Sequence, residues 1–91
     1  MNVLSTEMVN ERLRSLPGWK IENQEIARNF EFPDFGAAIQ FVDGVAEKAE
    51  SAGHHPNIDI RYNKVRLSLT SHDSGGITER DIKMAQVLNA L

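Results

Sequence analysis

The sequence predicts an α+β fold with its elements in the order α-β-β-α-β-β-α. Two segments alternate apolar and polar residues as β-hairpins do, a long segment between them has helical spacing of apolar residues, and shorter helical segments lie at both ends. Each predicted strand pair has one apolar and one polar face, as in an antiparallel sheet covered on one side. We therefore expect a four-stranded antiparallel sheet with helices packed on one face. A chain of 91 residues fits a single domain spanning 1–91.

The first helix is predicted over residues 6–16, where apolar side chains recur at helical spacing: Val9, Leu13 and Leu16. Pro17 and Gly18 then end this helix. A hairpin follows, with Asn23 and Gln24 as its turn. One face of its second strand carries three apolar residues: Ile26, Phe30 and Phe32.

A longer helix is predicted from the N-cap residue Asp34 to about residue 51. Its apolar stripe consists of Phe35, Ala38, Val42, Val45, Ala46, Ala49 and Ala52. Gly53 suits the position just after the helix, where the backbone often takes the left-handed conformation.

The second hairpin alternates on both strands. The apolar positions are Ile58, Ile60 and Tyr62 on the first strand, and Val65, Leu67 and Leu69 on the second. We expect a turn at Asn63 and Lys64, or a four-residue loop over 62–65, and both give the same register. The last helix begins at Thr78, which forms a variant of the capping box with Asp81.

Charge and composition argue against several classes of protein. A net charge of −3 at pH 7 is not that of a general nucleic-acid binder. The absence of cysteine excludes disulfides, thiolate chemistry and zinc sites that need sulfur. No run approaches the ~20 apolar residues that span a bilayer, and the segment from Met1 to Leu4 does not resemble a signal peptide. We therefore expect a soluble, cytoplasmic protein that binds neither nucleic acid nor membrane.

The histidines are the best indication of chemistry, because imidazole exchanges protons near neutral pH. The chain has three of them, all between residues 54 and 72: His54, His55 and His72. The expected turn sets Tyr62 opposite Val65. Continued outward, the same register sets His55 opposite His72, with their Cβ atoms about 5 Å apart.

Two imidazoles this close should not both be protonated, because like charge disfavours the second proton. One neutral and one protonated ring would supply a base and an acid in a single site. Glu50 lies one helical turn before His54. A carboxylate there could orient an imidazole or favour its protonated form.

Several motifs follow one another in a fixed order: Glu50-x-x-x-His54-His55-Pro56, Tyr62-Asn63-Lys64-Val65, Leu69-Thr70-Ser71-His72-Asp73, Gly76-Ile77-Thr78 and Asp81. Upstream of them stand Leu16-Pro17-Gly18-Trp19 and Phe30-x-Phe32. This ordered set resembles the pterin-4a-carbinolamine dehydratases, and the resemblance covers nearly the whole chain.

The resemblance implies an enzyme that dehydrates the 4a-hydroxytetrahydropterin left by aromatic amino acid hydroxylases. The products are quinonoid dihydropterin and water, and neither a metal nor an organic cofactor is used. The resemblance also implies the catalytic residues: His54, His55 and His72. Glu50 and Asp81 match acidic positions around the family's site, and we expect both, together with Pro56, to bind the substrate.

The resemblance and the small core further suggest a homo-oligomer, a homotetramer in which strands or helices of each subunit complete a sheet or a bundle. Two positions differ from animal members of the family. Ile58 stands where those members often have tryptophan, and Gly53 stands where an amide or acidic residue is common. We expect these differences to affect substrate affinity more than reaction type.

Two other functions are compatible with the same residues. Three imidazoles can bind zinc and leave one position open, although adjacent histidines on a strand would point to opposite faces. A non-enzymatic assembly module acting through an exposed sheet edge would need none of the histidines. Asp81 could also serve as a helix cap alone, and Glu50 could belong to a solvated acidic face.

Overall fold

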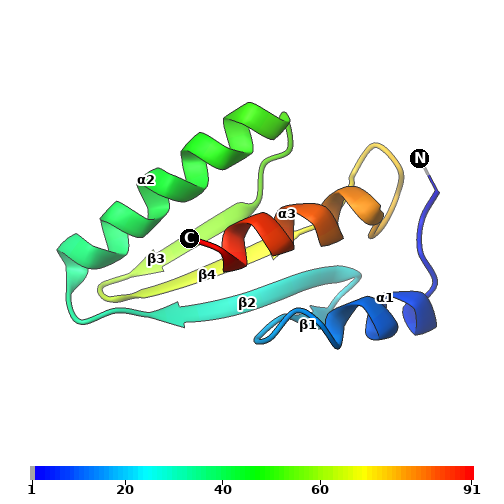
Figure 1. The fold of residues 1–91 in the computed structure, drawn as a ribbon, viewed down its shortest axis with the longest axis horizontal. Coiled ribbons are helices and arrows are strands. Elements are labelled where there is room, and N and C mark those ends of the chain that lie inside the picture. The colour runs from blue at the N-terminus through cyan, green and yellow to red at the C-terminus, as the bar shows by residue number, and fades with distance from the viewer. Residues whose placement is uncertain (1) are drawn as a thin grey trace.

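The structure, a computed structural model, describes residues 2–91 and contains three helices and a four-stranded sheet (Figure 1). The elements are α1 (Thr6–Leu13), β1 (Lys20–Glu22), β2 (Glu25–Glu31), α2 (Phe35–Ala52), β3 (Asn57–Arg61), β4 (Lys64–Leu69) and α3 (Glu79–Asn89). This order confirms the predicted α+β class. Met1, where the predicted domain and the segment compared with signal peptides begin, lies outside the described residues. Among residues 2–91, no helix is both long and apolar enough to cross a membrane.

The sheet has the strand order β1-β2-β4-β3, and all neighbouring strands are antiparallel. One face of β4 is buried: Val65, Leu67 and Leu69. Its other face carries polar residues: Lys64, Arg66 and Ser68. All three helices pack into one core cluster with the buried face, through Val9, Ala38, Val45, Ile82, Ala85 and Leu88. The helices therefore cover one face of the sheet, and Figure 1 shows α3 in front of β4.

The first helix ends at Leu13 rather than at the predicted Leu16. Beyond it the amides bond one residue closer than in an α-helix, as from Leu16 N to Leu13 O (3.0 Å). Pro17 explains the early end, because a proline drives the residue before it out of the helical conformation. Leu16 is nevertheless buried.

The predicted apolar stripe of α2 is buried only in part. The buried members are Ala38, Val45 and Ala49, with Val42 half-buried. Ala46 and Ala52 are exposed, and so is the Phe35 side chain. The apolar stripe of α2 therefore extends beyond the part of the helix that the rest of the chain buries.

The β3–β4 hairpin has a register different from the predicted one. The observed pairs are Ile60 with Val65 and Ile58 with Leu67, so the turn consists of Tyr62 and Asn63. Asn63 is held there by Phe32, because its Nδ2 donates to Phe32 O (2.8 Å) and its carbonyl accepts from Phe32 N (2.9 Å). The two registers differ by two positions and keep the same residues on the apolar face, so alternation alone cannot distinguish them.

The predicted direct pairing of His55 with His72 is therefore wrong. The ladder between β3 and β4 stops at Asn57 and Ser68, before it reaches either histidine. His54, His55 and Pro56 lie in the connection between α2 and β3 and not on a strand.

Gly53 ends α2 and determines where His54 begins. Its φ of +63° lies in the left-handed region, which glycine adopts without steric cost. Gly53 N donates to Glu50 O (3.3 Å) and His54 N donates to Ala49 O (3.1 Å), which are the paired bonds of a Schellman motif. The backbone of His54 is thereby held against the last turn of α2.

α3 is fixed at both ends. At its start, Thr78 and Asp81 form the predicted capping box. Near its end, Asn89 Oδ1 accepts hydrogen bonds from Trp19 Nε1 (2.7 Å) and Arg28 Nη1 (2.6 Å). The first turn of α3 therefore has a fixed place relative to the sheet.

We predict that Gly53→Ala lowers the free energy of unfolding by about 1 kcal/mol, or about 4–8 °C in Tm. The cause is backbone strain, because an added Cβ would meet no atom within 4 Å beyond its two chain neighbours. Gly53→Asn should cost less, since asparagine tolerates the left-handed conformation. Thermal unfolding followed by circular dichroism measures both. Equal Tm values for Gly53→Ala and the wild-type protein would contradict this account of the helix end.

Candidate active site

Asp81 carries the carboxylate around which the site is built. Its side chain is 0% exposed and lies at the third position of α3. Oδ2 accepts hydrogen bonds from Thr78 N (2.8 Å) and from Ser71 Oγ (2.9 Å). The capping box thus fixes a carboxylate in the protein interior, and these donors replace the water that burial removes.

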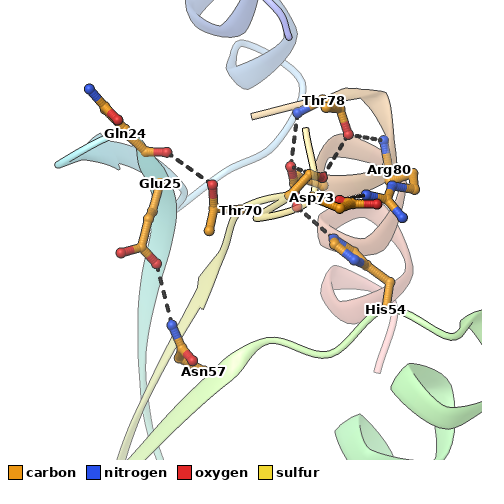
Figure 2. A network of polar contacts seen from close by, with 10 residues as sticks. Gln24, Glu25, His54, Asn57, Thr70, Asp73, Thr78 and Arg80 are labelled. Atoms are coloured by element: carbon orange, nitrogen blue, oxygen red, sulfur yellow. Dashed lines mark hydrogen bonds and ion pairs between the residues drawn. The ribbon is translucent and has the colours of Figure 1, made fainter. Parts of the chain in front are cut away.

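His54 makes the third contact with this carboxylate. Its Nε2 lies 2.6 Å from Asp81 Oδ1, and its side chain is 11% exposed. Figure 2 shows His54 reaching from the connection before β3 toward the start of α3. So short a distance is typical of a charge-assisted hydrogen bond. The sequence placed both residues in the candidate site but did not predict their contact.

Ser71 belongs to the same cluster, and the sequence reasoning did not single it out. It is 1% exposed, and its Oγ lies 2.8 Å from Thr78 Oγ1 in addition to its contact with Asp81. Ser71 continues the buried alternation of β4 beyond Leu69. A hydroxyl at a buried position of an apolar pattern needs a polar partner, and this signal could have identified it.

His55 lies beside Glu50. Its Nε2 is 3.5 Å from Glu50 Oε1, and the two side chains are 59% and 79% exposed. A pair this exposed and this long contributes little energy, so the ring of His55 is only loosely held. Glu50 therefore neighbours His55, whereas the carboxylate that contacts His54 comes from Asp81.

His72 lies in the loop between β4 and α3. Ser71 and Gly76 close this loop as an isolated antiparallel bridge, in which Ser71 N donates to Gly76 O (3.0 Å). The exposed His72 lines a cavity of about 220 Å³ with Asn23, Gln24, Glu25, Thr70, Gly75 and Gly76. Neither His54 nor His55 lines this cavity.

Arg80 braces the same loop through Asp73. Arg80 Nη2 donates to Asp73 Oδ1, and this hydrogen bond holds the pKa of Asp73 below its ordinary value. A carboxyl group with a lowered pKa stabilises the fold when it is ionised, and this stabilisation is lost as the pH falls through that pKa. The brace is therefore present at neutral pH and is released in acid.

One chain of contacts connects the segments that carry the histidines. His54 contacts Asp81, and Asp81 contacts Ser71, which is the sequence neighbour of His72. Pro56 is half-buried and directly precedes β3, where its missing N–H costs no ladder bond. The structure thus pairs His54 with Asp81 and His55 with Glu50, and leaves His72 on the adjoining loop.

The alternative of a three-histidine metal site has no support in this geometry. Within residues 2–91, no group of three histidine, aspartate or glutamate side chains is arranged to hold a metal ion. The zinc site considered from the sequence would need three such side chains to converge.

A larger cavity, of about 530 Å³, lies on the open face of the sheet across β2, β3 and β4. Its polar lining residues are Asn29, Glu31, Asp59, Arg61, Lys64 and Arg66. None of the predicted site residues lines it, and charges of both signs pair there, as Arg61 does with Asp59 (3.2 Å). We assign it to the polar outer surface of the sheet.

Comparison with known proteins identifies close relatives of the whole chain. The sequence model of the family described as "Pterin 4 alpha carbinolamine dehydratase" matches residues 2–91. A protein of Acidobacterium capsulatum named as a pterin-4-alpha-carbinolamine dehydratase is 58% identical over 91 residues, which are 100% of this chain and 99% of that protein. A protein of the same name from Chloroflexus aurantiacus is 52% identical over 88 residues, 97% of this chain and 95% of that protein.

Solved structures share the fold. The crystal structure of a transcriptional coactivator/pterin dehydratase from Brucella melitensis matches with a TM-score of 0.93 and 42% identity, over 98% of this chain and 97% of that one. A pterin dehydratase-like protein described as a RuBisCO assembly factor in the α-carboxysome has a TM-score of 0.66 and 22% identity, over 79% of this chain and 83% of that one. This second likeness shows the fold alone. With its family model matched over residues 2–91 and relatives identical at more than half of their positions, the chain belongs to the pterin-4a-carbinolamine dehydratase family.

Proposed function

We propose that this protein dehydrates 4a-hydroxytetrahydropterins to quinonoid dihydropterins by histidine acid–base catalysis, as a lyase of pterin cofactor recycling. The observation that carries the proposal is the 2.6 Å contact between His54 Nε2 and the buried Asp81 carboxylate, in a chain of this family. An imidazole oriented by a buried carboxylate is suited to exchanging protons with a bound molecule.

The reaction needs two proton transfers and no external oxidant or reductant. The hydroxyl group on C4a takes a proton from an acid and leaves as water. The ring nitrogen next to C4a gives its proton to a base, and its electron pair forms the new carbon–nitrogen double bond. One imidazole must therefore be protonated and another neutral when the substrate binds.

The three histidines differ in how firmly they are held, and the proposal gives them different tasks. His54 is largely enclosed and is hydrogen-bonded to Asp81, which suits the step that needs a fixed orientation. The ring of His55 is exposed and loosely held by Glu50, which suits proton exchange with water. His72 borders a cavity beside Thr70 and approaches the pterin from the loop. Glu50 and Pro56 are the remaining residues that we expect to contact the pterin. Asp81, which we expected from the sequence to bind the substrate as well, is fully enclosed and is instead assigned the role of orienting His54.

We also propose that the enzyme is a homo-oligomer, with a homotetramer as the expected form, and that it acts in the cytoplasm. Within residues 2–91, β3 has β4 as its one strand neighbour, and all five of its residues are exposed. Ile58 and Ile60 expose apolar surface along this edge, next to the exposed Tyr62. An open edge strand with apolar side chains is an association surface, because monomeric proteins usually protect such edges with charge.

His54→Gln should lower the dehydration rate by about 10²–10⁴-fold, because glutamine can still donate to Asp81 but cannot transfer a proton. His55→Ala and His72→Ala should each lower the rate by a similar factor. The rate is measured with freshly prepared 4a-hydroxytetrahydropterin and corrected for spontaneous dehydration. A wild-type protein that gives no acceleration, or folded variants with near wild-type rates, would overturn the proposal. Circular dichroism establishes that each variant is folded.

Glu50→Gln should lower the same rate by less than about tenfold, because its contact with His55 is exposed and long. Glu47→Gln is the matched control, since Glu47 is an exposed carboxylate of the same helix. The control should keep the wild-type rate. A loss of several hundredfold in Glu50→Gln would instead show that Glu50 transfers a proton itself.

Ile60→Lys should shift the protein toward smaller assemblies, because a charge on the edge of β3 opposes pairing with a second copy. Val87→Lys is the control, since Val87 on α3 is 36% exposed and Ile60 is 37% exposed. Light scattering coupled to size-exclusion chromatography measures the mass of each protein. A wild-type protein that is monomeric at micromolar concentration would disprove the assembly.

A further inference from the structure

We infer that Asp81, Ser71 and Thr78 are positioning residues that hold the neutral ring of His54 as its Nε2–H tautomer and leave Nδ1 as the atom that exchanges protons with the substrate. The kinetic part of this inference rests on the proposed dehydratase function. The assignment of the His54 tautomer does not depend on that function.

The direction of the hydrogen bonds follows from counting protons. Thr78 N can only donate, so Oδ2 of Asp81 accepts from it (2.8 Å). Ser71 has one hydroxyl proton and gives it to the same oxygen (2.9 Å). Ser71 Oγ must then accept from Thr78 Oγ1 (2.8 Å), and Thr78 Oγ1 in turn accepts from Arg80 N (3.2 Å). Every proton in this series of hydrogen bonds therefore points toward Asp81.

The remaining oxygen of Asp81 faces His54. A carboxylate has acceptor atoms only, so Nε2 must carry the proton that lies between it and Oδ1 (2.6 Å). In a neutral imidazole the other nitrogen is then an acceptor. The carboxylate thus selects one tautomer, and it is itself oriented by the donors of Ser71 and Thr78.

Nδ1 is also the ring nitrogen that the hydrogen bond to Asp81 leaves free. No hydrogen bond to it is found within residues 2–91, where Arg80 Nε is the single fully buried side-chain nitrogen or oxygen without a partner. Nδ1 is therefore not sealed in the interior. Asp81, in contrast, is 0% exposed, so it acts through His54 and not by touching the substrate.

Asp81→Asn provides a sharp test, because the surrounding donors dictate how the amide must lie. Thr78 N and Ser71 Oγ need an acceptor, so the amide oxygen takes the place of Oδ2. The amide NH₂ then faces His54 and donates to Nε2, which forces the proton onto Nδ1. A single substitution should therefore invert the tautomer without emptying any space.

Ring ¹⁵N chemical shifts, measured at a pH where the imidazoles are neutral, report the tautomer directly. The His54 signals are assigned by their loss in His54→Gln. We expect the Nε2–H form in the wild-type protein and the Nδ1–H form in Asp81→Asn, with His55 and His72 unchanged as internal controls. A wild-type ring in the Nδ1–H form, or an Asp81→Asn ring that keeps Nε2–H, would overturn the inference. The wild-type spectrum decides the point even if Asp81→Asn does not fold.

Kinetic measurements distinguish residues that position His54 from residues that only stabilise the fold. Asp81→Asn should lower kcat by about 10²–10⁴-fold with KM changed less than about threefold, because the base would carry its proton on the wrong nitrogen. Ser71→Ala should lower kcat by about tenfold, and Ser71→Thr, which keeps the hydroxyl, should restore it. A wild-type kcat in folded Ser71→Ala would remove Ser71 from the positioning set. If the wild-type protein did not accelerate dehydration but showed the expected tautomers, the proposed function would fail while the ring assignment stood.

Discussion

The buried carboxylate of Asp81 is the constraint on which the rest of the site depends. A carboxylate removed from water must receive hydrogen bonds or it destabilises the fold strongly. Its three donors come from different parts of the chain: Thr78 N from the start of α3, Ser71 Oγ from the loop after β4, and His54 Nε2 from the connection after α2. The need to satisfy one charge therefore brings these segments together at a single point.

Local hydrogen-bonded motifs hold the segments that carry these donors. The Schellman motif at Gly53 fixes the backbone of His54 against α2, and the bridge between Ser71 and Gly76 closes the loop that follows β4. Asn89 anchors the far end of α3 through Trp19 and Arg28. An imidazole with the role proposed for His54 needs its position held within about 0.5 Å, and these local motifs fix the surrounding segments without a ligand.

Local chemistry in the sequence predicted most of the fold. Asp34, Gly53 and Thr78 each act within one turn of the residues that they cap, so their roles could be read from neighbouring positions. The β3–β4 register could not, because a shift by two positions preserves the apolar face and the choice depends on Asn63 contacting Phe32, which lies just beyond β2. The sequence also named the residues of the candidate site but not their pairing. The contact between His54 and Asp81 joins residues 27 positions apart and depends on the placement of α3.

The double role of Asp81 limits which residues this position can accept. As a helix cap it needs only an acceptor for Thr78 N, and asparagine would serve equally well. As the partner of His54 it must accept with both oxygens at once, and only a carboxylate can do that. Glutamate has the right charge, but its extra methylene would have to fit a fully enclosed site. The stability of α3 and the orientation of the imidazole thus both depend on the side chain of Asp81. Capping the helix requires one acceptor oxygen, whereas orienting the ring as well requires two.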